Sequence, residues 1–242
     1  MASIIDERGF NQGFALTHAQ RLRLRRRADR IVAAMSGVAP AQSRVLELGC
    51  GTGELAAELA RGSGARVTGV DISPKFIEVA QAQHRQPLLD FQVADVIGMG
   101  PVSPEERYHY IVGNGILHHL YYNLDHVLER LQQWLHPGGR LVFWEPNILN
   151  PYIYVIFSYT APRRWARLEP DEMAFSAKFI ASKLSHAGYQ RIAVTPRDYL
   201  LPNTPRLLVR PVSLIGDQLE RVAFVRNTAQ SLFIVADRPL VE

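Results

Sequence analysis

Cysteine, internal repeats and long apolar runs are scarce or missing in this sequence of 242 residues, and each scarcity excludes a class of protein. Cys50 is the single cysteine, which excludes a disulfide scaffold and fits a reducing compartment. No stretch approaches the roughly 18 apolar residues of a membrane-spanning helix, which excludes a polytopic membrane protein. The first ten residues, MASIIDERGF, carry acids where a secretory signal peptide has its apolar core. We therefore expect a cytoplasmic protein.

The composition predicts one folded domain with an uneven distribution of charge. Hydrophobic residues make up 47% and charged residues 21%, close to globular averages, and the length fits a single large α/β domain. The formal net charge of +4 falls within residues 1–40, mostly in the six arginines between Arg21 and Arg30. Such a run can bind nucleic acid or anionic lipid. We favour the simpler interpretation, a solvated helix face on a helix that packs against the domain.

From residue 44 onward, short β-branched runs alternate with helical patterns. Strands are expected at 44–48, 66–70, 90–94, 108–112, 140–144, 191–195 and 231–236. Helices are expected at 54–60, 74–84, 125–135 and 175–188. This alternation predicts right-handed crossovers and a largely parallel sheet covered by helices on both faces. Ligands of such sheets bind beyond the carboxyl ends of the strands, so we expect the functional site at that edge.

A glycine loop, Gly49-Cys50-Gly51-Thr52-Gly53, follows the first of these strands. Without Cβ atoms such a turn lets a ligand approach the backbone, and the next helix N-terminus favours electron-rich groups. Glu47 lies two residues before Gly49, where a carboxylate could meet an ammonium group. Asp71 ends the next strand and could accept hydrogen bonds from both hydroxyls of a ribose. A tight turn without a ligand and a dinucleotide site are the alternatives, although the third glycine at 53 departs from GxGxxG.

Five segments in order resemble the motifs of class I S-adenosylmethionine-dependent methyltransferases. They are VLELGCGTGELAAELA at 45–60, VTGVDISPKFIEVAQ at 67–81, FQVADV at 91–96, YIVGNGILHHL at 110–120 and LHPGGRLVFWEPN at 135–147. The chain is most similar to the small-molecule group that includes quinone-biosynthesis and natural-product enzymes. The resemblance implies a Rossmann-like, mostly parallel seven-stranded sheet with an antiparallel last strand, here SLFIVA at 231–236. It also implies S-adenosyl-L-methionine as cofactor and S-adenosyl-L-homocysteine as product.

The family's binding roles, carried to the matching residues, imply a cofactor site. Glu47 and the backbone of Gly49, Gly51 and Gly53 would hold the methionine part. Asp71 would bind the ribose and Ile72 would pack on the adenine. Asp95 would meet the adenine amino group, Val96 would line its pocket, and Gly113 and Asn114 would lie near the methionine end. A helix cap is the alternative role for Asp95.

Methyl transfer to oxygen or nitrogen requires the acceptor to lose a proton, and a histidine can take it. His118 and His119 follow the fourth strand and are the candidates, with helix capping or packing as the alternative. We assign no metal, because no further His or Cys cluster accompanies the pair. Glu145 and Asn147 end the fifth strand, where they either orient a substrate or form turns.

Three segments stand outside the regular pattern of what we expect to be one methyltransferase domain spanning 1–242. Residues 1–40 predict an N-terminal helical cap, 146–175 a lid-like insertion and 200–228 a second insertion. Aromatic residues of the lid, Tyr152 and Tyr154 among them, would cover the pocket and contact the substrate; ordinary core is the alternative. The apolar insertions indicate a hydrophobic substrate and, more weakly, peripheral contact with a membrane surface.

The sequence therefore predicts an S-adenosylmethionine-dependent methyltransferase of a small hydrophobic or aromatic metabolite, with the accepting atom undetermined. A non-catalytic cofactor-binding partner subunit and a protein or RNA methyltransferase are alternatives, and a nicotinamide-dependent reductase is a third. Nucleic acid is not the expected substrate, because Gly113-Asn114-Gly115-Ile116 stands where base-methylating enzymes carry Asp/Asn-Pro-Pro-Tyr. A homodimer is left open.

Overall fold

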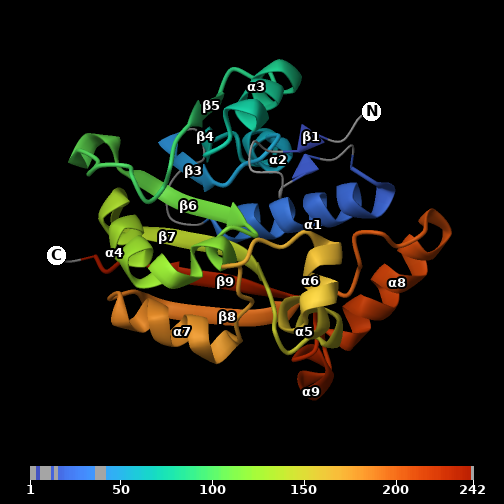
Figure 1. Cartoon of the computed structure of the whole chain (residues 1–242). Helices are drawn as coiled ribbons and strands as arrows, with labels where there is room; N and C mark the ends of the chain where they lie inside the picture. Colours follow the sequence, from blue (N-terminus) through green and yellow to red (C-terminus); the bar gives the residue numbers. More distant parts are fainter. Residues whose placement is uncertain (1–3, 6–11, 14–15, 36–41, 241–242) are drawn as a thin grey trace.

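The computed structural model describes residues 4–5, 12–13, 16–35 and 42–240, and its centre is a seven-stranded sheet (Figure 1). The strand order is β5-β4-β3-β6-β7-β9-β8. The strands are β3 Arg44–Leu48, β4 Arg66–Asp71, β5 Leu89–Val93, β6 Tyr108–Asn114, β7 Leu135–Pro146, β8 Gln190–Arg197 and β9 Ser231–Asp237. The first five pair in parallel, whereas β9 runs antiparallel to both β7 and β8. The predicted fold, including the reversed last strand, is confirmed. A separate short ladder pairs β1 Ile4–Ile5 with β2 Gln12–Gly13.

Helices connect the strands and cover both faces of the sheet. They are α1 His18–Ala34, α2 Glu54–Ser63, α3 Pro74–Gln83, α4 Leu124–Trp134, α5 Pro151–Ser158, α6 Thr160–Ala166, α7 Ala177–His186, α8 Arg206–Leu219 and α9 Ala223–Arg226. Two 3-10 helices, η2 Pro104–Glu106 and η3 Leu117–Asn123, complete the connections. Helix α3 begins as the sequence predicts, because Pro74 opens it and Ser73 Oγ accepts a hydrogen bond from Phe76 N at 3.2 Å.

Two apolar layers hold this arrangement together, because successive side chains of a strand point to opposite faces. In β3, Leu46 and Leu48 belong to the layer that α4 and α7 cover, whereas Val45 belongs to the layer under α1 and α2. All three are fully buried. A strand buried on both faces reads as a mostly apolar run, as in β3, where four of the five residues are buried.

Helix α1 packs on the domain as expected, and Arg21 and Arg25 are exposed, whereas Arg23, Arg27 and Arg30 form partly buried ion pairs in place of the expected solvated face. Asp198 Oδ2 accepts from Arg23 Nε at 2.6 Å and from Arg27 Nη2 at 3.0 Å. Arg30 pairs with Glu220 at 3.2 Å. Burial would raise the pKa of Asp198, but the charges of the two arginines lower it to about 2. These pairs fasten α1 to segments that lie far away in the sequence.

Candidate active site

A cavity of about 660 Å³ lies at the carboxyl edge of the sheet. The ends of β3, β4 and β6 and the residues after β5 form one wall, and residues 166–172 of the segment predicted as a lid help to form the other. Nine residues predicted from the sequence line it: Gly49, Gly51, Asp71, Ile72, Asp95, Val96, Asn114, His118 and His119. The topology therefore gathers in one place side chains that are up to 70 positions apart in the sequence.

The glycine loop needs its glycines for two different reasons. Gly49 has φ +61°, and a Cβ there would lie 2.7 Å from Cδ1 of Ile116, so the turn has no room for a side chain. Gly51 has φ +53°, but a Cβ there would meet none of the residues that the structure describes within 4 Å, which leaves open space among them over its backbone. Asp71 Oδ2 accepts from Gly51 N at 2.8 Å, and its Oδ1 accepts from Ser73 N at 2.9 Å. Asp71 thus ties the loops after β3 and β4 together at the cavity wall.

Glu47 lies below the loop and outside the cavity wall. It is 2% exposed, and its Oε2 has no hydrogen-bond partner. Burial, together with the charges of Glu54 and Asp71, raises the pKa of this carboxyl well above its usual range. A cation beside this carboxyl would favour its ionised form, so the orphaned oxygen is suited to a cationic ligand group. Gly53 and Gly113 also lie outside the wall: Gly53 precedes α2, and Gly113 packs against Phe143.

The remaining strand-end residues take up local contacts at the cavity. Asp95 Oδ1 accepts from Ile97 N at 2.9 Å and so closes a turn, with no helix beginning there. Ile72 is half-exposed and Val96 is buried. Asn114 Oδ1 accepts from Arg27 Nη1 at 2.5 Å, so Arg27 is the N-terminal arginine that reaches this edge of the sheet. Burial and the neighbouring Arg23 lower the pKa of Arg27 to about 10.

His118 is enclosed between two carboxylates. Its Nδ1 lies 2.8 Å from Glu145 Oε2, and its Nε2 lies 3.6 Å from Glu172 Oε2. Burial alone would lower the pKa of His118, but the hydrogen bonds and charges of Glu145 and Glu172 outweigh it and raise the pKa to about 9. The ring is therefore an imidazolium at neutral pH.

The two polar residues that end β7 contact protein groups and lie outside the cavity wall. Glu145 is 1% exposed, and its Oε1 accepts from Ile116 N at 3.0 Å and from Leu117 N at 2.7 Å. It therefore fixes the turn that carries His118. Asn147 is fully buried, and its Nδ2 donates to the carbonyls of Asn227 at 2.9 Å and Ala229 at 2.8 Å.

His119 lines the cavity beside two acids that the sequence reading missed. Its Nδ1 lies 3.3 Å from Glu172 Oε1 and 3.8 Å from Glu169 Oε2. Burial opposes ionisation of Glu172, yet a hydrogen bond from His118 and the charges of both histidines lower its pKa below the usual value. Ligand atoms of His118, His119 and Glu172 all lie within 4.8 Å of one another, a spacing that a metal ion can bridge. The signal that could have revealed these acids is EPDE at 169–172, which follows a stretch, 146–168, without any acid.

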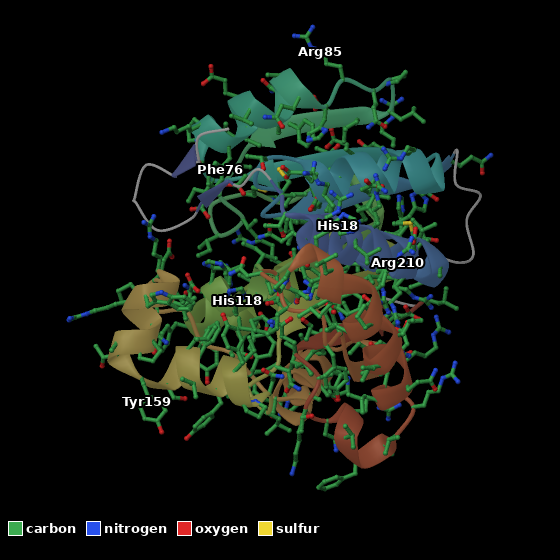
Figure 2. The ribbon with its side chains drawn as sticks, turned by 90° about the vertical axis from the view of Figure 1, so that its right-hand side faces the viewer. His18, Phe76, Arg85, His118, Tyr159 and Arg210 are labelled. Atoms are coloured by element: carbon green, nitrogen blue, oxygen red, sulfur yellow. The ribbon has the colours of Figure 1, made fainter. Side chains whose placement is uncertain are left out.

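The predicted lid contributes its second half to the cavity and leaves its aromatic helix outside. Ala166, Arg167 and Leu168 belong to the wall, whereas Tyr152 and Tyr154 are exposed on α5 and do not. Figure 2 shows Phe76 above and His118 below the cavity that both line, with Tyr159 at the outer edge of the molecule. Residues of the second insertion, 200–228, do not appear in this wall.

Comparison with known proteins agrees with this geometry. Residues 19–193 match a family model described as a methyltransferase domain. The O-methyltransferase cnsE of Penicillium expansum is 28% identical over 222 residues, which cover 83% of this chain and 74% of that protein. Demethylmenaquinone methyltransferase of Chlorobaculum tepidum is 28% identical over 121 residues, 48% of each chain, so this chain spans about half of that relative. A Haloferax volcanii methyltransferase solved in complex with the Trm112 methyltransferase activator shares the fold, with a TM-score of 0.67 and 20% identity over 90% of this chain and 92% of that one.

The chain therefore belongs to the methyltransferase-domain family, in agreement with the resemblance of its five motifs. It is a class I S-adenosylmethionine-dependent methyltransferase, and S-adenosyl-L-methionine is its cofactor.

Proposed function

We propose that the protein methylates a small apolar metabolite, bound in this cavity, at an oxygen or nitrogen atom. The proposal is supported by one observation: the same cavity is lined both by the strand-end residues of the cofactor motifs and by His119 beside Glu172. The cavity volume of about 660 Å³ is in the range of small-molecule sites. Ile116, Leu120 and Leu168 give the wall an apolar part, which suits a hydrophobic acceptor.

The residues present fit the cofactor. The open space over Gly51 suits a ligand that lies on the loop backbone. The orphaned Oε2 of Glu47 suits an ammonium group, but contact requires the loop to shift, because Glu47 is buried outside the cavity wall. The residues that would hold S-adenosylmethionine are Glu47, Gly49, Gly51, Gly53, Asp71, Ile72, Asp95, Val96, Gly113 and Asn114. The bound cofactor supplies an activated methyl group, so the protein mainly orients the acceptor and excludes water.

Of the two histidines, His119 is the one suited to take the proton of the acceptor. His118 is already protonated near neutral pH and is held on both sides, so its role is to position the loop and Glu172. His119 reaches the cavity with Nδ1 next to Glu172, and a carboxylate at one ring nitrogen orients the ring and holds the tautomer in which the other nitrogen can accept a proton.

The substrate residues divide into two groups. Glu145 acts through the 116–118 turn as a positioning residue. Substrate contact by Asn147, Tyr152 and Tyr154 stays a prediction, and it requires the 146–175 segment to move, because none of the three lines the cavity as it stands.

The test compares turnover of a hydroxylated or aminated aromatic acceptor by the unchanged protein and by a variant of His119. We expect His119→Gln to lower turnover by about 10²- to 10⁴-fold while the affinity for S-adenosylhomocysteine stays the same. His186→Gln, a change at an exposed histidine on α7, is the matched control. Unchanged turnover in His119→Gln would remove the base assignment, and an equal loss of turnover and cofactor affinity would indicate a packing role instead.

A non-catalytic cofactor-binding partner subunit is the alternative to this proposal, and the neighbour solved with an activator protein does not favour it, because the likeness is to the methyltransferase of that complex. The discriminating observation is release of S-adenosylhomocysteine from S-adenosylmethionine when acceptors are added. Release with apolar small molecules supports the proposal, and release with only protein or RNA selects those substrates. No release from folded, cofactor-bound protein favours the subunit role.

A further inference from the structure

The outward face of helix α8 is apolar, the reverse of what a surface helix normally shows. Leu207 is 91% exposed, Leu214 is 67% exposed and Ile215 is 59% exposed. Phe224 on the adjoining α9 is 86% exposed. Figure 1 shows α8 and α9 together at one end of the molecule, away from the β5 edge of the sheet.

The inner contacts of α8 fix this orientation. Val209 is fully buried with Ala19 of α1 and Leu200, and a Cβ at Gly216 would lie 3.1 Å from Cβ of Tyr199. Asp217 pairs with Arg26 of α1. Because these contacts hold one side of the helix against the domain, the leucines on the other side face solvent.

The charges that α8 presents beside this apolar face are positive, apart from Asp217, which pairs with Arg26 of α1. Arg206 and Arg210 are exposed on α8, and residues 199–216 include no acid. The acids that follow, Asp217 and Glu220, are both engaged by arginines of α1. The outward surface therefore offers aliphatic and aromatic side chains flanked by cations.

We propose that the α8–α9 surface, formed by Leu207, Leu214, Ile215 and Phe224 with Arg206 and Arg210, docks on a bilayer that contains anionic lipids. Helices that lie in a membrane interface bury an apolar face at the acyl boundary and place arginines against the headgroup phosphates. Among the residues that the structure describes, none of the helices is long and apolar enough to cross the bilayer, so the contact is peripheral.

Charge favours this occupant over a second copy of the chain. A two-fold interface would bring the same patch of both copies together, so that two surfaces that each carry Arg206 and Arg210 would meet. The patch supplies no free acid in 199–216 to neutralise them. An anionic lipid surface complements both the arginines and the apolar face. The inference rests on this surface alone and is independent of the methylated substrate.

The experiment is flotation of the full chain with phosphatidylcholine vesicles, with and without phosphatidylglycerol. We expect binding to the mixed vesicles that falls as salt is added. The double variant Leu207→Ser/Leu214→Ser should lower the partition coefficient at least tenfold, and Leu240→Ser, at an exposed leucine outside α8 and α9, should leave it unchanged. Arg206→Gln/Arg210→Gln should remove the preference for phosphatidylglycerol.

Three results would overturn the proposal. One is that the chain floats with neither kind of vesicle. Another is that Leu240→Ser lowers the partition coefficient as much as Leu207→Ser/Leu214→Ser does. The third is a concentration-dependent dimer in sedimentation that dissociates in Leu207→Ser/Leu214→Ser, which would assign the surface to a second copy. Because these positions are exposed, each variant should melt at the temperature of the unchanged protein, which confirms that a loss of binding is not a loss of fold.

Discussion

The enclosure of His118 by two carboxylates makes the stability of the protein depend on pH in a predictable way. The pKa of His118 rises from its ordinary value of 6.5 to about 9 in the folded protein. A shift of that size corresponds to about 3 kcal/mol of folding free energy. Because the folded pKa is raised, this stabilisation is fully present below about pH 6.5 and disappears as the pH rises through about 9.

The perturbation is His118→Gln, measured by urea unfolding at about pH 6 and about pH 9.5. At the lower pH the variant should be less stable than the unchanged protein, and at the higher pH most of this difference should vanish. The loss of unfolding free energy caused by His118→Gln should be about 3 kcal/mol larger at the lower pH than at the higher pH, which is the free energy that corresponds to the pKa shift. His186→Gln, at an exposed histidine, controls for the ordinary titration of surface groups.

If His118→Gln lowers the free energy of unfolding by the same amount at both pH values, the charge of His118 does not stabilise the fold. This result would mean that the histidine contributes through packing and not through its charge. The pairing with Glu145 and Glu172 would then carry no net stabilisation.

Three further predictions concern other parts of the structure. Asp71→Ala should weaken S-adenosylhomocysteine binding at least tenfold, about 1.4 kcal/mol, whereas Asp90→Ala, at an exposed acid on β5, should not; equal affinities would remove the ribose assignment. Dialysis against a chelator should leave turnover unchanged, and a loss that one divalent metal restores would show that the His118, His119 and Glu172 cluster holds an ion. Asp198→Asn should destabilise the fold by about 3 kcal/mol near neutral pH, because it leaves buried arginine charge without its partner, and the difference should shrink as the pH falls toward about 2; an unchanged urea midpoint would contradict this.

The strands and the cofactor motifs could be predicted because their signals are local. Arg44–Leu48 is the same strand in the sequence reading and in the structure, and Ser73 with Pro74 starts α3 where the pattern places it. Nine of the predicted residues line one cavity, because parallel strands bring their carboxyl ends to one edge regardless of the connecting loops, although Gly53, Gly113 and Glu145 lie outside its wall.

The contacts across the cavity could not be predicted, because they depend on the path of long connections. Glu172 lies 53 positions after His119, and only the course of the 146–175 segment brings the two side chains to 3.3 Å. The arginines of α1 find Asp198 more than 170 positions away. Of the two roles that the sequence left open for Glu145, substrate orientation and turn formation, the contacts fit the second, because backbone N–H groups of the 116–118 turn donate to its carboxylate. A helical pattern at 206–219 likewise does not reveal which face of α8 the domain covers.

Calorimetric titration with S-adenosylhomocysteine, with NAD as the control ligand, is the measurement that decides whether the carboxyl edge of the sheet holds the cofactor. We expect micromolar binding of S-adenosylhomocysteine and no heat with NAD. Absence of S-adenosylhomocysteine binding to folded, ligand-free protein, or equal binding of NAD, would contradict it.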